Sequence, residues 1–390
     1  MKRILYLLLI PLLLASCKDD FDISKLQDSP RLVVYSFPTE GDTTLIAVTK
    51  SVPIVAAKGD RYALSNLPVD AHIIYKVNGT EYPVKKIESE EEARHFCYYT
   101  GEHTFELMKG QYYAVGHQQA GDRISVEVSA EGFEPVSAST DIPEKMKVQI
   151  DDIKVRDWND SSFISMNQME VSLADEGSSK DYYSVKVNKL QMAGEAICMN
   201  KHSDMGKDYV DTIRVYTYRD YRAKAEEYPN GVWNFDSLFL MKEEQTIDTD
   251  KEPILNKQTK LDEDLGFDGY EFFYNSYVFD DRLFNGKKCT LHLGLVNSKS
   301  FNAYFSNFWD SLYGFTYIVE LYKLTPEYYR YLSAVNSAKS NSWAEAGIMQ
   351  VTPTYSNVKG GFGVVAGFSV NTVSQYIAPP KEIKKDTFVY

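Results

Sequence analysis

Strict alternation of apolar and polar residues is the feature that most constrains how this chain can fold. Within residues 181–188, Tyr183, Val185 and Val187 fall on one face and polar residues on the other. This period of two predicts a half-buried antiparallel strand. The same pattern recurs over residues 147–155, 209–218, 270–279, 287–296 and 315–324. Aromatic residues make up 14% of the chain, which also favours β structure because aromatic side chains pack well on pleated surfaces.

The first third of the chain contains shorter β-prone runs. An Asn78-Gly79 dipeptide separates two of them, and Asn-Gly between such runs is a strong hairpin signal. Short strands at this spacing predict an immunoglobulin-like β-sandwich over residues 31–143. The runs cover residues 31–35, 44–49, 71–77, 82–84, 110–115 and 122–128. The charged residues 88–96 are expected to form a short helix or a long hairpin loop.

The best domain boundary is the segment 142–145, Ile-Pro-Glu-Lys. Beyond it we expect a larger antiparallel β domain over residues 144–380, followed by a polar tail over residues 381–390. The predicted fold class is therefore mostly β, with an N-terminal sandwich, a larger second β domain and a few short helices.

One helix start is well marked in the second domain. Thr325 can cap the helix, Pro326 suits its first position, and Glu327 complements the helix dipole. Further along, the Gly360-Gly361 pair predicts a turn that leads into a closing strand.

The N-terminus has the layout of a secretory signal. Lys2 and Arg3 precede an apolar run over residues 4–14, which is too short to cross a hydrocarbon core that takes about 20 residues. The following stretch, Leu-Ala-Ser before Cys17, resembles the lipobox of bacterial lipoproteins, in which the cysteine is acylated and becomes the first mature residue. We therefore expect residues 1–16 to be a signal peptide and Cys17 to carry lipid, because two or more acyl chains give a stable membrane anchor. The alternative is an ordinary secretory signal that happens to contain a cysteine.

Residues 17–30 are expected to form the acylated cysteine and an acidic tether. Lys18, Asp19, Asp20 and Asp22 resemble the export signal that carries Bacteroidota lipoproteins to the outside of the outer membrane. The alternative is a solvated tether whose acids serve solubility. The predicted location is the outer membrane, by lipid anchor, with the protein at the cell surface.

Charge excludes one class of partner. The chain has a net charge of −13, and removal of residues 1–16 takes away two bases and no acid. Binding to nucleic acid needs clustered Lys and Arg side chains, so we expect no nucleic-acid partner.

Cysteine and histidine patterns point to no metal centre and no cofactor. Cys97, Cys198 and Cys289 are widely spaced and form no CxxC pair, and Cys289 alternates with leucines as on the buried face of a strand. The six histidines lack ligand spacing such as HExxH. No nucleophile elbow, P-loop or Rossmann fingerprint is present.

Two clusters of acids suggest calcium, but neither follows the order of an EF-hand loop. They are Asp262, Asp264 and Asp268, and the pair Asp248 and Asp250. A solvated acidic loop is the simpler interpretation. A glycosidase would need two carboxylates facing each other at about 5 to 9.5 Å, and the sequence alone selects no such pair among 55 acids.

Exposed aromatic rings suit sugar or peptide binding. Trp233 follows Pro229-Asn230-Gly231, a turn signature, so it is the tryptophan we expect to protrude and the candidate ligand-binding residue. Burial is the more common fate of tryptophan.

Three segments of the C-terminal third, in this order, resemble the Bacteroidota lipoprotein family known as domain of unknown function 4249. They are residues 279–287 (FDDRLFNGK), 324–332 (LTPEYYRYL) and 355–369 (YSNVKGGFGVVAGFS). The resemblance covers nearly all of the mature chain and implies an outer-membrane lipoprotein, often encoded near TonB-dependent transporters. It brings no catalytic residue with it. The motifs also have structural interpretations, as a turn, a helix start and a tight backbone passage.

The leading functional hypothesis is a non-enzymatic accessory that binds a nutrient or a TonB-dependent transporter, with the outer-membrane bilayer as partner through the lipid on Cys17. One alternative is a surface hydrolase with a carboxylate pair in a cleft between the domains. The other is a structural or adhesive surface protein.

Overall fold

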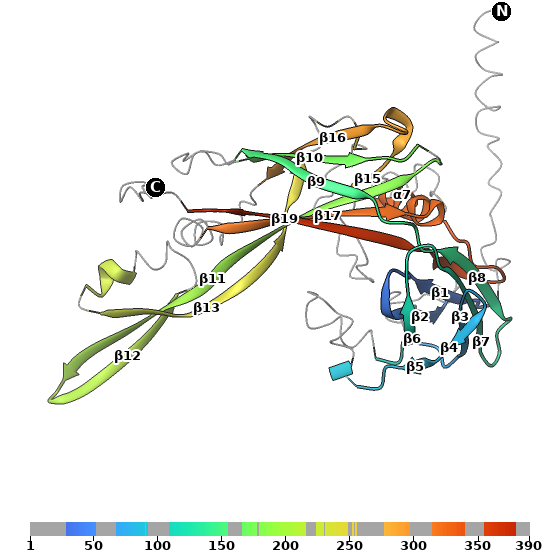
Figure 1. The fold of residues 1–390 in the computed structure, drawn as a ribbon. Helices are drawn as coiled ribbons and strands as arrows, with labels where there is room; N and C mark the ends of the chain where they lie inside the picture. The colour runs from blue at the N-terminus through green and yellow to red at the C-terminus, as the bar shows by residue number, and fades with distance from the viewer. Residues whose placement is uncertain are drawn as a thin grey trace, which may run out of the picture.

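The computed structural model describes residues 29–51, 68–89, 91–92, 109–154, 166–177, 179–215, 224–229, 231–248, 252, 254–255, 277–296, 314–339 and 355–379. The fold is mostly β, as the sequence predicts, with several antiparallel sheets. Figure 1 shows two packed β units and a long arm that reaches away from them. No helix in the described ranges is long and apolar enough to cross a membrane.

Two sheets form the first β unit. Its N-terminal strands are β1 (Leu32–Ser36), β2 (Gly41–Lys50), β3 (His72–Val77), β4 (Thr80–Tyr82), β5 (Val84–Lys86), β6 (Tyr112–Gln118), β7 (Arg123–Ser129) and β8 (Val136–Asp141). Sheet A contains β1, β2, β6 and β5, and sheet B contains β4, β3, β7 and β8 in spatial order. Alternate residues of both sheets, such as Val34 of β1 and Tyr75 of β3, are buried in one shared core.

The hairpin predicted at Asn78-Gly79 is confirmed. Both residues have a positive φ, 51° and 85°, and Val77 faces Thr80 across the turn. Two successive left-handed residues are the geometry of a type I′ turn, which matches the twist of the strands it joins.

A strand from the far end of the chain completes sheet A. β18 (Phe362–Val365) pairs in parallel with β1, with Val33 opposite Phe362 and Ser36 opposite Val365. The sequence predicts this closing strand as part of the second domain, residues 144–380. The chain instead returns to the first unit after it has formed the second, so sheet A contains strands from both ends of the described chain.

The second β unit also consists of two sheets. Its strands are β9 (Lys147–Lys154), β10 (Met166–Ala174), β11 (Tyr182–Asp204), β12 (Lys207–Val215), β13 (Val232–Glu244), β14 (Thr246–Asp248), β15 (Tyr277–Asp280), β16 (Lys288–Val296), β17 (Phe315–Leu324) and β19 (Phe368–Ile377). Sheet C has the order β14-β16-β10-β9, and sheet D the order β12-β11-β17-β19, with β13 and β15 also paired to β11.

Sheets C and D pack face to face around the second core (Figure 1). The alternation in residues 181–188 is realised here, because Tyr183, Val185 and Val187 are all 0% exposed. Cys289 lies on the buried face of β16 together with its leucines, as predicted.

The arm is the outer part of β11 with the strands that flank it. We define it as residues 196–215 and 232–234, in which β12 pairs with residues 196–204 of β11 and the start of β13 pairs with residues 197–199. The strand predicted over 209–218 is confirmed as far as Val215, and residues 216–218 lie outside the described residues. Residues 205–212 are all exposed, so the expected burial of one face is wrong for residues 209–212. Tyr209 and Val210, on opposite faces of β12, are 47% and 54% exposed.

Candidate functional site

The first family motif, residues 279–287, forms a tight polar turn beside the start of β11. It contains the end of β15, the one-turn helix η3 (Asp281–Leu283) and the loop before β16. The Asp281 side chain, only 1% exposed, accepts the backbone N–H of Asp181 at 2.9 Å, and the Asp281 N–H donates to the Asp181 carbonyl at 3.2 Å. Asp281 therefore fixes the entry of β11 against this turn.

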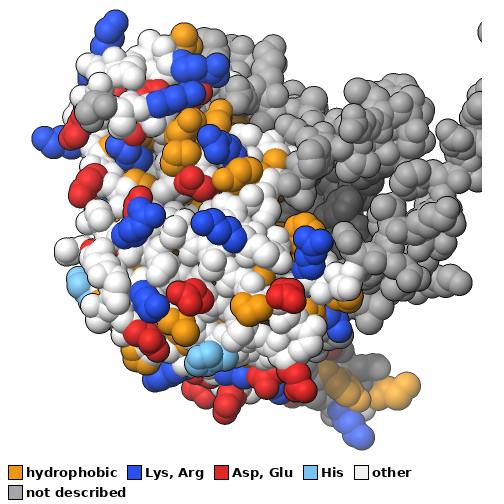
Figure 2. Space-filling model, turned by 90° about the vertical axis from the view of Figure 1, so that its right-hand side faces the viewer, with side chains coloured by type: hydrophobic (Ala, Val, Ile, Leu, Met, Phe, Trp, Pro, Cys, Tyr) orange, Lys and Arg blue, Asp and Glu red, His pale blue; other side chains and the backbone are white. Residues whose placement is uncertain are grey.

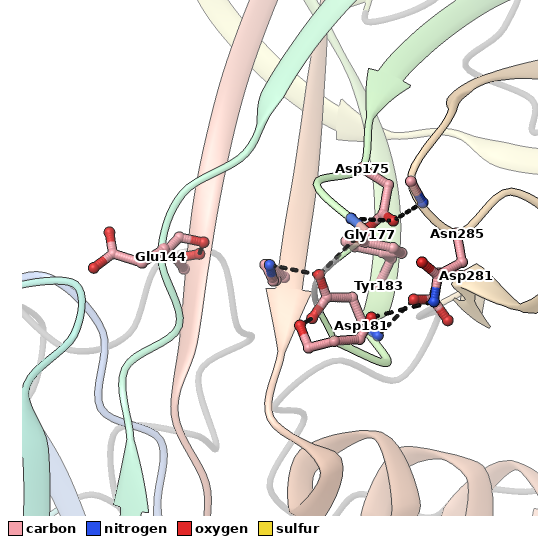
Figure 3. Close-up of polar contacts among 11 residues, drawn as sticks. Glu144, Asp175, Gly177, Asp181, Tyr183, Asp281 and Asn285 are labelled. Carbon is pink, nitrogen blue, oxygen red and sulfur yellow. Dashed lines mark hydrogen bonds and ion pairs between the residues drawn. The ribbon is translucent and has the colours of Figure 1, made fainter.

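Asp175 is the centre of the same cluster, at the turn between β10 and β11 (Figure 3). One carboxylate oxygen accepts the Tyr183 hydroxyl at 2.5 Å, and the other accepts the backbone N–H groups of Gly286 at 2.6 Å and Gly177 at 3.1 Å. Burial works against ionisation of Asp175, but these hydrogen bonds outweigh it and hold the pKa of the carboxyl below its ordinary value. Burial, reinforced by the bond to Asp175, raises the pKa of Tyr183, so its hydroxyl stays a donor.

Asp181 completes the cluster. Its carboxylate pairs with the Lys323 ammonium at 2.7 Å and accepts the Ser179 hydroxyl at 2.9 Å. The Tyr183 hydroxyl lies 3.4 Å from the same carboxylate. Three carboxylates thus gather around one tyrosine and one lysine, and each binds donors of this chain.

Close approach of two backbones explains the glycine of this motif. Gly177 and Gly286 both have a positive φ, 68° and 70°. A Cβ on Gly177 would lie 2.5 Å from the Gly286 Cα, closer than any side chain tolerates. The two turns touch as they do because Gly177 lacks a side chain, whereas a Cβ on Gly286 would be tight, at 3.3 Å from the Gly177 Cα. This contact brings both N–H groups to Asp175.

The third motif, residues 355–369, fastens β18 into the first unit. The Asn357 side chain both donates to the Val365 carbonyl at 2.7 Å and accepts the Val365 N–H at 2.9 Å. Gly363 has φ 107°, and a Cβ there would lie 2.0 Å from the Val34 carbonyl oxygen. Lys359 and Ser137 form an isolated bridge, which ties this segment to β8 as well as to β1.

The second motif, residues 324–332, opens α7 (Pro326–Lys339). Tyr328 is buried and stacks on Phe37 at a centroid distance of 4.6 Å, and Tyr331 lies 5.9 Å from the rings of both Phe37 and Tyr35. On another side, Tyr329 contacts Tyr182 at 4.5 Å. These rings, which we call the aromatic joint, connect the first unit to the start of sheet D.

The expected Thr325 cap differs from the observed geometry. Thr325 precedes α7, but its hydroxyl oxygen is buried without a hydrogen-bond partner in the described chain. Its backbone takes part instead: the Thr325 N–H donates to the Gly367 carbonyl at 3.1 Å, and the Thr325 carbonyl accepts the Tyr329 N–H at 3.0 Å. The helix therefore starts through backbone bonds and the proline, with Glu327 in its first turn.

A shallow depression of about 450 Å³ opens on the first unit between β3, β4, β5 and β6. Its lining includes His72, Tyr82, Lys86 and Tyr112. The Lys86 ammonium is paired with Asp70 at 2.7 Å and lies 5.8 Å from the centre of the Tyr112 ring. The lysine of this depression is therefore already paired with an acid and lies beside an aromatic ring. Figure 2, which views the side of the molecule that includes the first unit, shows acidic and basic side chains interspersed across the described surface.

The other residues singled out in the sequence fall in several places. Cys198 is a buried thiol, like Cys289, and burial raises the pKa of both, that of Cys289 to about 11. His292 is an exposed side chain whose Nδ1 lies 3.7 Å from the carboxylate of Glu252. Within the described ranges, no three His, Cys, Asp or Glu side chains gather as a metal site would require. Several predicted residues lie outside these ranges: Cys17, Lys18, Asp19, Asp20, Asp22, Cys97, Asp250, Asp262, Asp264 and Asp268.

Trp233 lies on the arm, not on a loop tip. It is half-buried on β13, opposite Cys198 of β11. Its role in ligand binding stays a prediction. No strand is predicted over β13 from the sequence, because the turn signature at residues 229–231 indicates a protruding segment after it.

The arm collects exposed apolar side chains. Of the nine large hydrophobic residues exposed in the described chain, five belong to it. They are Met199, Met205, Tyr209, Val210 and Val232. Sequence patterns could not reveal this surface, because an alternating strand normally implies a buried face.

Comparison with known proteins supports the family resemblance. A search of curated protein sequences gives no match. The model of the family described as domain of unknown function 4249 matches residues 18–374, nearly the whole chain. The resemblance of the three motifs is thereby confirmed, and this protein is a member of that family of unknown function.

Proposed function

We propose that this protein is a lipid-anchored accessory of the outer membrane, without catalytic activity, that binds a nutrient or a TonB-dependent transporter. The lipobox-like sequence before Cys17 supports the anchor, and residues 18–22 support display at the cell surface. The family match begins at residue 18, which fits a mature chain that starts at Cys17.

The arm is the observation that carries the binding role. It projects from a body made of two joined β units (Figure 1) and exposes five of the nine large apolar side chains noted above. Single exposed apolar side chains are normal on a protein surface and need no explanation. Several that gather on one feature lower solubility and are typical of a surface that binds another protein. We therefore assign partner binding to the two faces of the arm.

The hydrolase alternative has less support. The carboxylates that gather in the structure, Asp175, Asp181 and Asp281, bind N–H and O–H groups of this chain. A general acid or nucleophile has to face a substrate instead. The structural or adhesive alternative differs from an accessory only in its partner, so the partner decides between them.

Co-purification tests the proposal. The full chain is extracted in detergent from outer membranes of its source, and the proteins that accompany it are identified by mass spectrometry. A double variant, Met199→Ser with Val210→Ser, removes two apolar groups from one face of the arm and should lose the partner. Leu283→Ser, at a residue 73% exposed outside the arm, is the matched control and should keep it.

A native protein that emerges alone and binds no glycan, peptide or metal removes support from the accessory role. The anchor is tested separately, by mass spectrometry of the mature amino terminus. An unacylated Cys17, or cleavage beyond it, contradicts the anchor. Protease treatment of intact cells tests display, and full protection until lysis contradicts it.

A further inference from the structure

One face of the arm carries three of its five exposed apolar side chains. Met199 of β11 lies directly opposite Val232 of β13 and Thr212 of β12, and Val210 lies two residues from Thr212 on the same face. Met199, Val210 and Val232 are 44%, 54% and 63% exposed. Side chains that are neighbours on one face of a sheet lie roughly 5 to 8 Å apart, so these three form one continuous surface. We call it the open face.

The opposite face is covered at the root of the arm, and we call it the covered face. Cys198 is 0% exposed there, and its cross-strand partners Ile213 and Trp233 are half-buried. Gly231, just before β13, lies against the same face, because a Cβ built on it would lie 2.3 Å from the Cys198 sulfur. The two faces of the arm therefore differ in what already packs on them.

The open face continues the buried face of β11. Side chains alternate along a strand, so Met199 shares a face with Tyr183, which packs in the core between sheets C and D. The register shift at the root of the arm sets residues 235–236 of β13 opposite Ala196 alone, so the extra residue belongs to β13 and the alternation of β11 is unbroken. Along this one face the exposed fraction rises from 0% at Tyr183 and 1% at Gln191 to 44% at Met199. A face that a sheet covers in the body thus lies in solvent on the arm.

The charge of the open face differs from that of the chain as a whole. The chain has a net charge of −13, but the exposed Lys201 lies on this face, directly opposite Val210, and forms no ion pair within the described ranges. Asp208, an acid of the same face, accepts the hydroxyl of Ser203. An acidic side chain at the border of a partner's apolar surface therefore finds a complementary charge here.

Three other occupants fit this face less well. A small nutrient is usually held in a concave pocket, whereas one face of a strand ribbon is open to solvent. A lipid bilayer would have to accept Lys201 and Asp208 beside the apolar groups, and burial of charge in hydrocarbon is costly. A second copy that packs the same face on itself would bring the two Lys201 ammonium groups toward each other.

We propose that a partner protein packs an apolar surface, bordered by an acidic side chain, on the open face of the arm, and that this acid pairs with Lys201. The inference rests on the proposed function, which assigns partner binding to both faces, and narrows it to one face and to the chemistry of the surface that binds. The partner covers Met199, Val210 and Val232 in the way that sheet C covers the inner part of the same face.

Photo-cross-linking from the two faces tests this assignment. The full chain is prepared with the photoreactive residue p-benzoylphenylalanine in place of Val210, on the open face, or of Tyr209, on the covered face. The two positions are adjacent in β12 and similarly exposed, at 54% and 47%, so they are matched. Each chain is added to detergent-extracted outer membranes of its source and irradiated. Position 210 should link to the protein that co-purifies with the native chain, and position 209 should yield little of that product.

Lys201→Glu tests the pairing with an acid. A like charge opposite the partner's acid should lower the recovered partner by roughly tenfold or more, whereas Lys201→Arg keeps the charge and should retain it. Lys207→Glu, next to the turn of the arm and on the covered face, is the matched control, because it changes the net charge equally and should retain the partner. Circular dichroism of each variant checks that the chain is folded.

Three results overturn the inference and leave the proposed function in place. The first is a partner that cross-links equally well from positions 209 and 210. The second is a cross-link from position 210 only to a second copy of this chain or to lipid, while another protein or a small ligand co-purifies. The third is undiminished recovery of the partner with Lys201→Glu. A native chain that emerges with no bound molecule is a different result, because it contradicts the proposed function itself.

Discussion

Removal of the Asp175 carboxylate tests whether the first family motif is a structural lock. In the folded chain this carboxylate accepts one O–H group and two backbone N–H groups, at 2.5, 2.6 and 3.1 Å. Asp175→Ala leaves all three donors in a site that was 9% exposed. Each orphaned buried donor destabilises by about 1–3 kcal/mol. Tyr183 can redirect its hydroxyl to Asp181, 3.4 Å away, which recovers part of the loss. We expect a loss of roughly 2–5 kcal/mol in the free energy of unfolding.

Asp175→Asn separates charge from geometry. The amide keeps an oxygen for the two N–H groups, and its NH₂ group can donate to the Tyr183 hydroxyl. What is lost is the charge assistance, so we expect a loss of about 1–2 kcal/mol at neutral pH.

The pH dependence follows from the lowered pKa of Asp175. A depressed pKa in the folded state contributes stability above the unfolded value of about 3.9, and this stability is lost as the pH falls through the folded pKa. The difference between the native protein and Asp175→Asn should therefore shrink below about pH 4.

Urea unfolding of the full chain in detergent, followed by circular dichroism between pH 3 and 7, measures these effects. Glu127→Gln is the matched control: its carboxylate is exposed and forms a surface pair with Lys76 at 3.4 Å, so its removal should change stability by less than about 0.5 kcal/mol. If Asp175→Ala unfolds at the native urea concentration, the cluster is no lock. If it also abolishes a hydrolytic activity, the enzyme alternative gains the support it lacks.

Three further predictions concern the β18 segment, the start of α7 and the two buried thiols. Gly363→Ala should destabilise the fold by more than about 3 kcal/mol and expose β18 to limited proteolysis, because the added Cβ would lie 2.0 Å from a backbone carbonyl oxygen. The control Gly132→Ala, at a residue with φ 80° and open space around it, should lose only about 1 kcal/mol. Equal losses in the two variants would contradict the clash. Thr325→Ala should be neutral or slightly stabilising in thermal unfolding, since the hydroxyl lacks a partner; the loss of about 1 kcal/mol typical of a removed cap would refute this. Cys198 and Cys289 should resist iodoacetamide at pH 8 until the chain unfolds, because burial raises their pKa, and peptide mapping that finds rapid native labelling would contradict it.

Local pattern predicted the strands and one hairpin because both are encoded over a few residues. The alternation that buries Tyr183, Val185 and Val187 is visible within one octapeptide, and Asn78-Gly79 determines its own turn. The position of β18 is different in kind. Its partner β1 lies more than three hundred residues earlier in the chain, and no local rule states that a C-terminal strand returns to the first sheet.

The polar cluster was beyond the sequence for a related reason. Asp175 and Gly286 meet only after β10 and β16 have paired, since that pairing aligns the two turns at the same end of sheet C. Among 55 acids, nothing local distinguishes Asp175 from an acid of a solvated loop. The glycines of the motif were recognisable as turn residues, but their contact depends on the register of strands far apart in the chain.

The two halves of β11 show why the fold is easier to read from this sequence than the function. Residues 183–187 and 199–203 belong to one strand, yet only the first set is covered by sheet C. Alternation of apolar and polar residues indicates that a strand has two different faces. It does not indicate what covers each face, because that depends on distant elements of the chain or on other molecules. The three family motifs correspond to the polar cluster around Asp175, the aromatic joint and the segment that holds β18 in sheet A, and all three stabilise the body of the protein. The arm contains none of these motifs and presents its apolar side chains to solvent, so the identity of this protein's partners has to be sought in what binds residues 196–215.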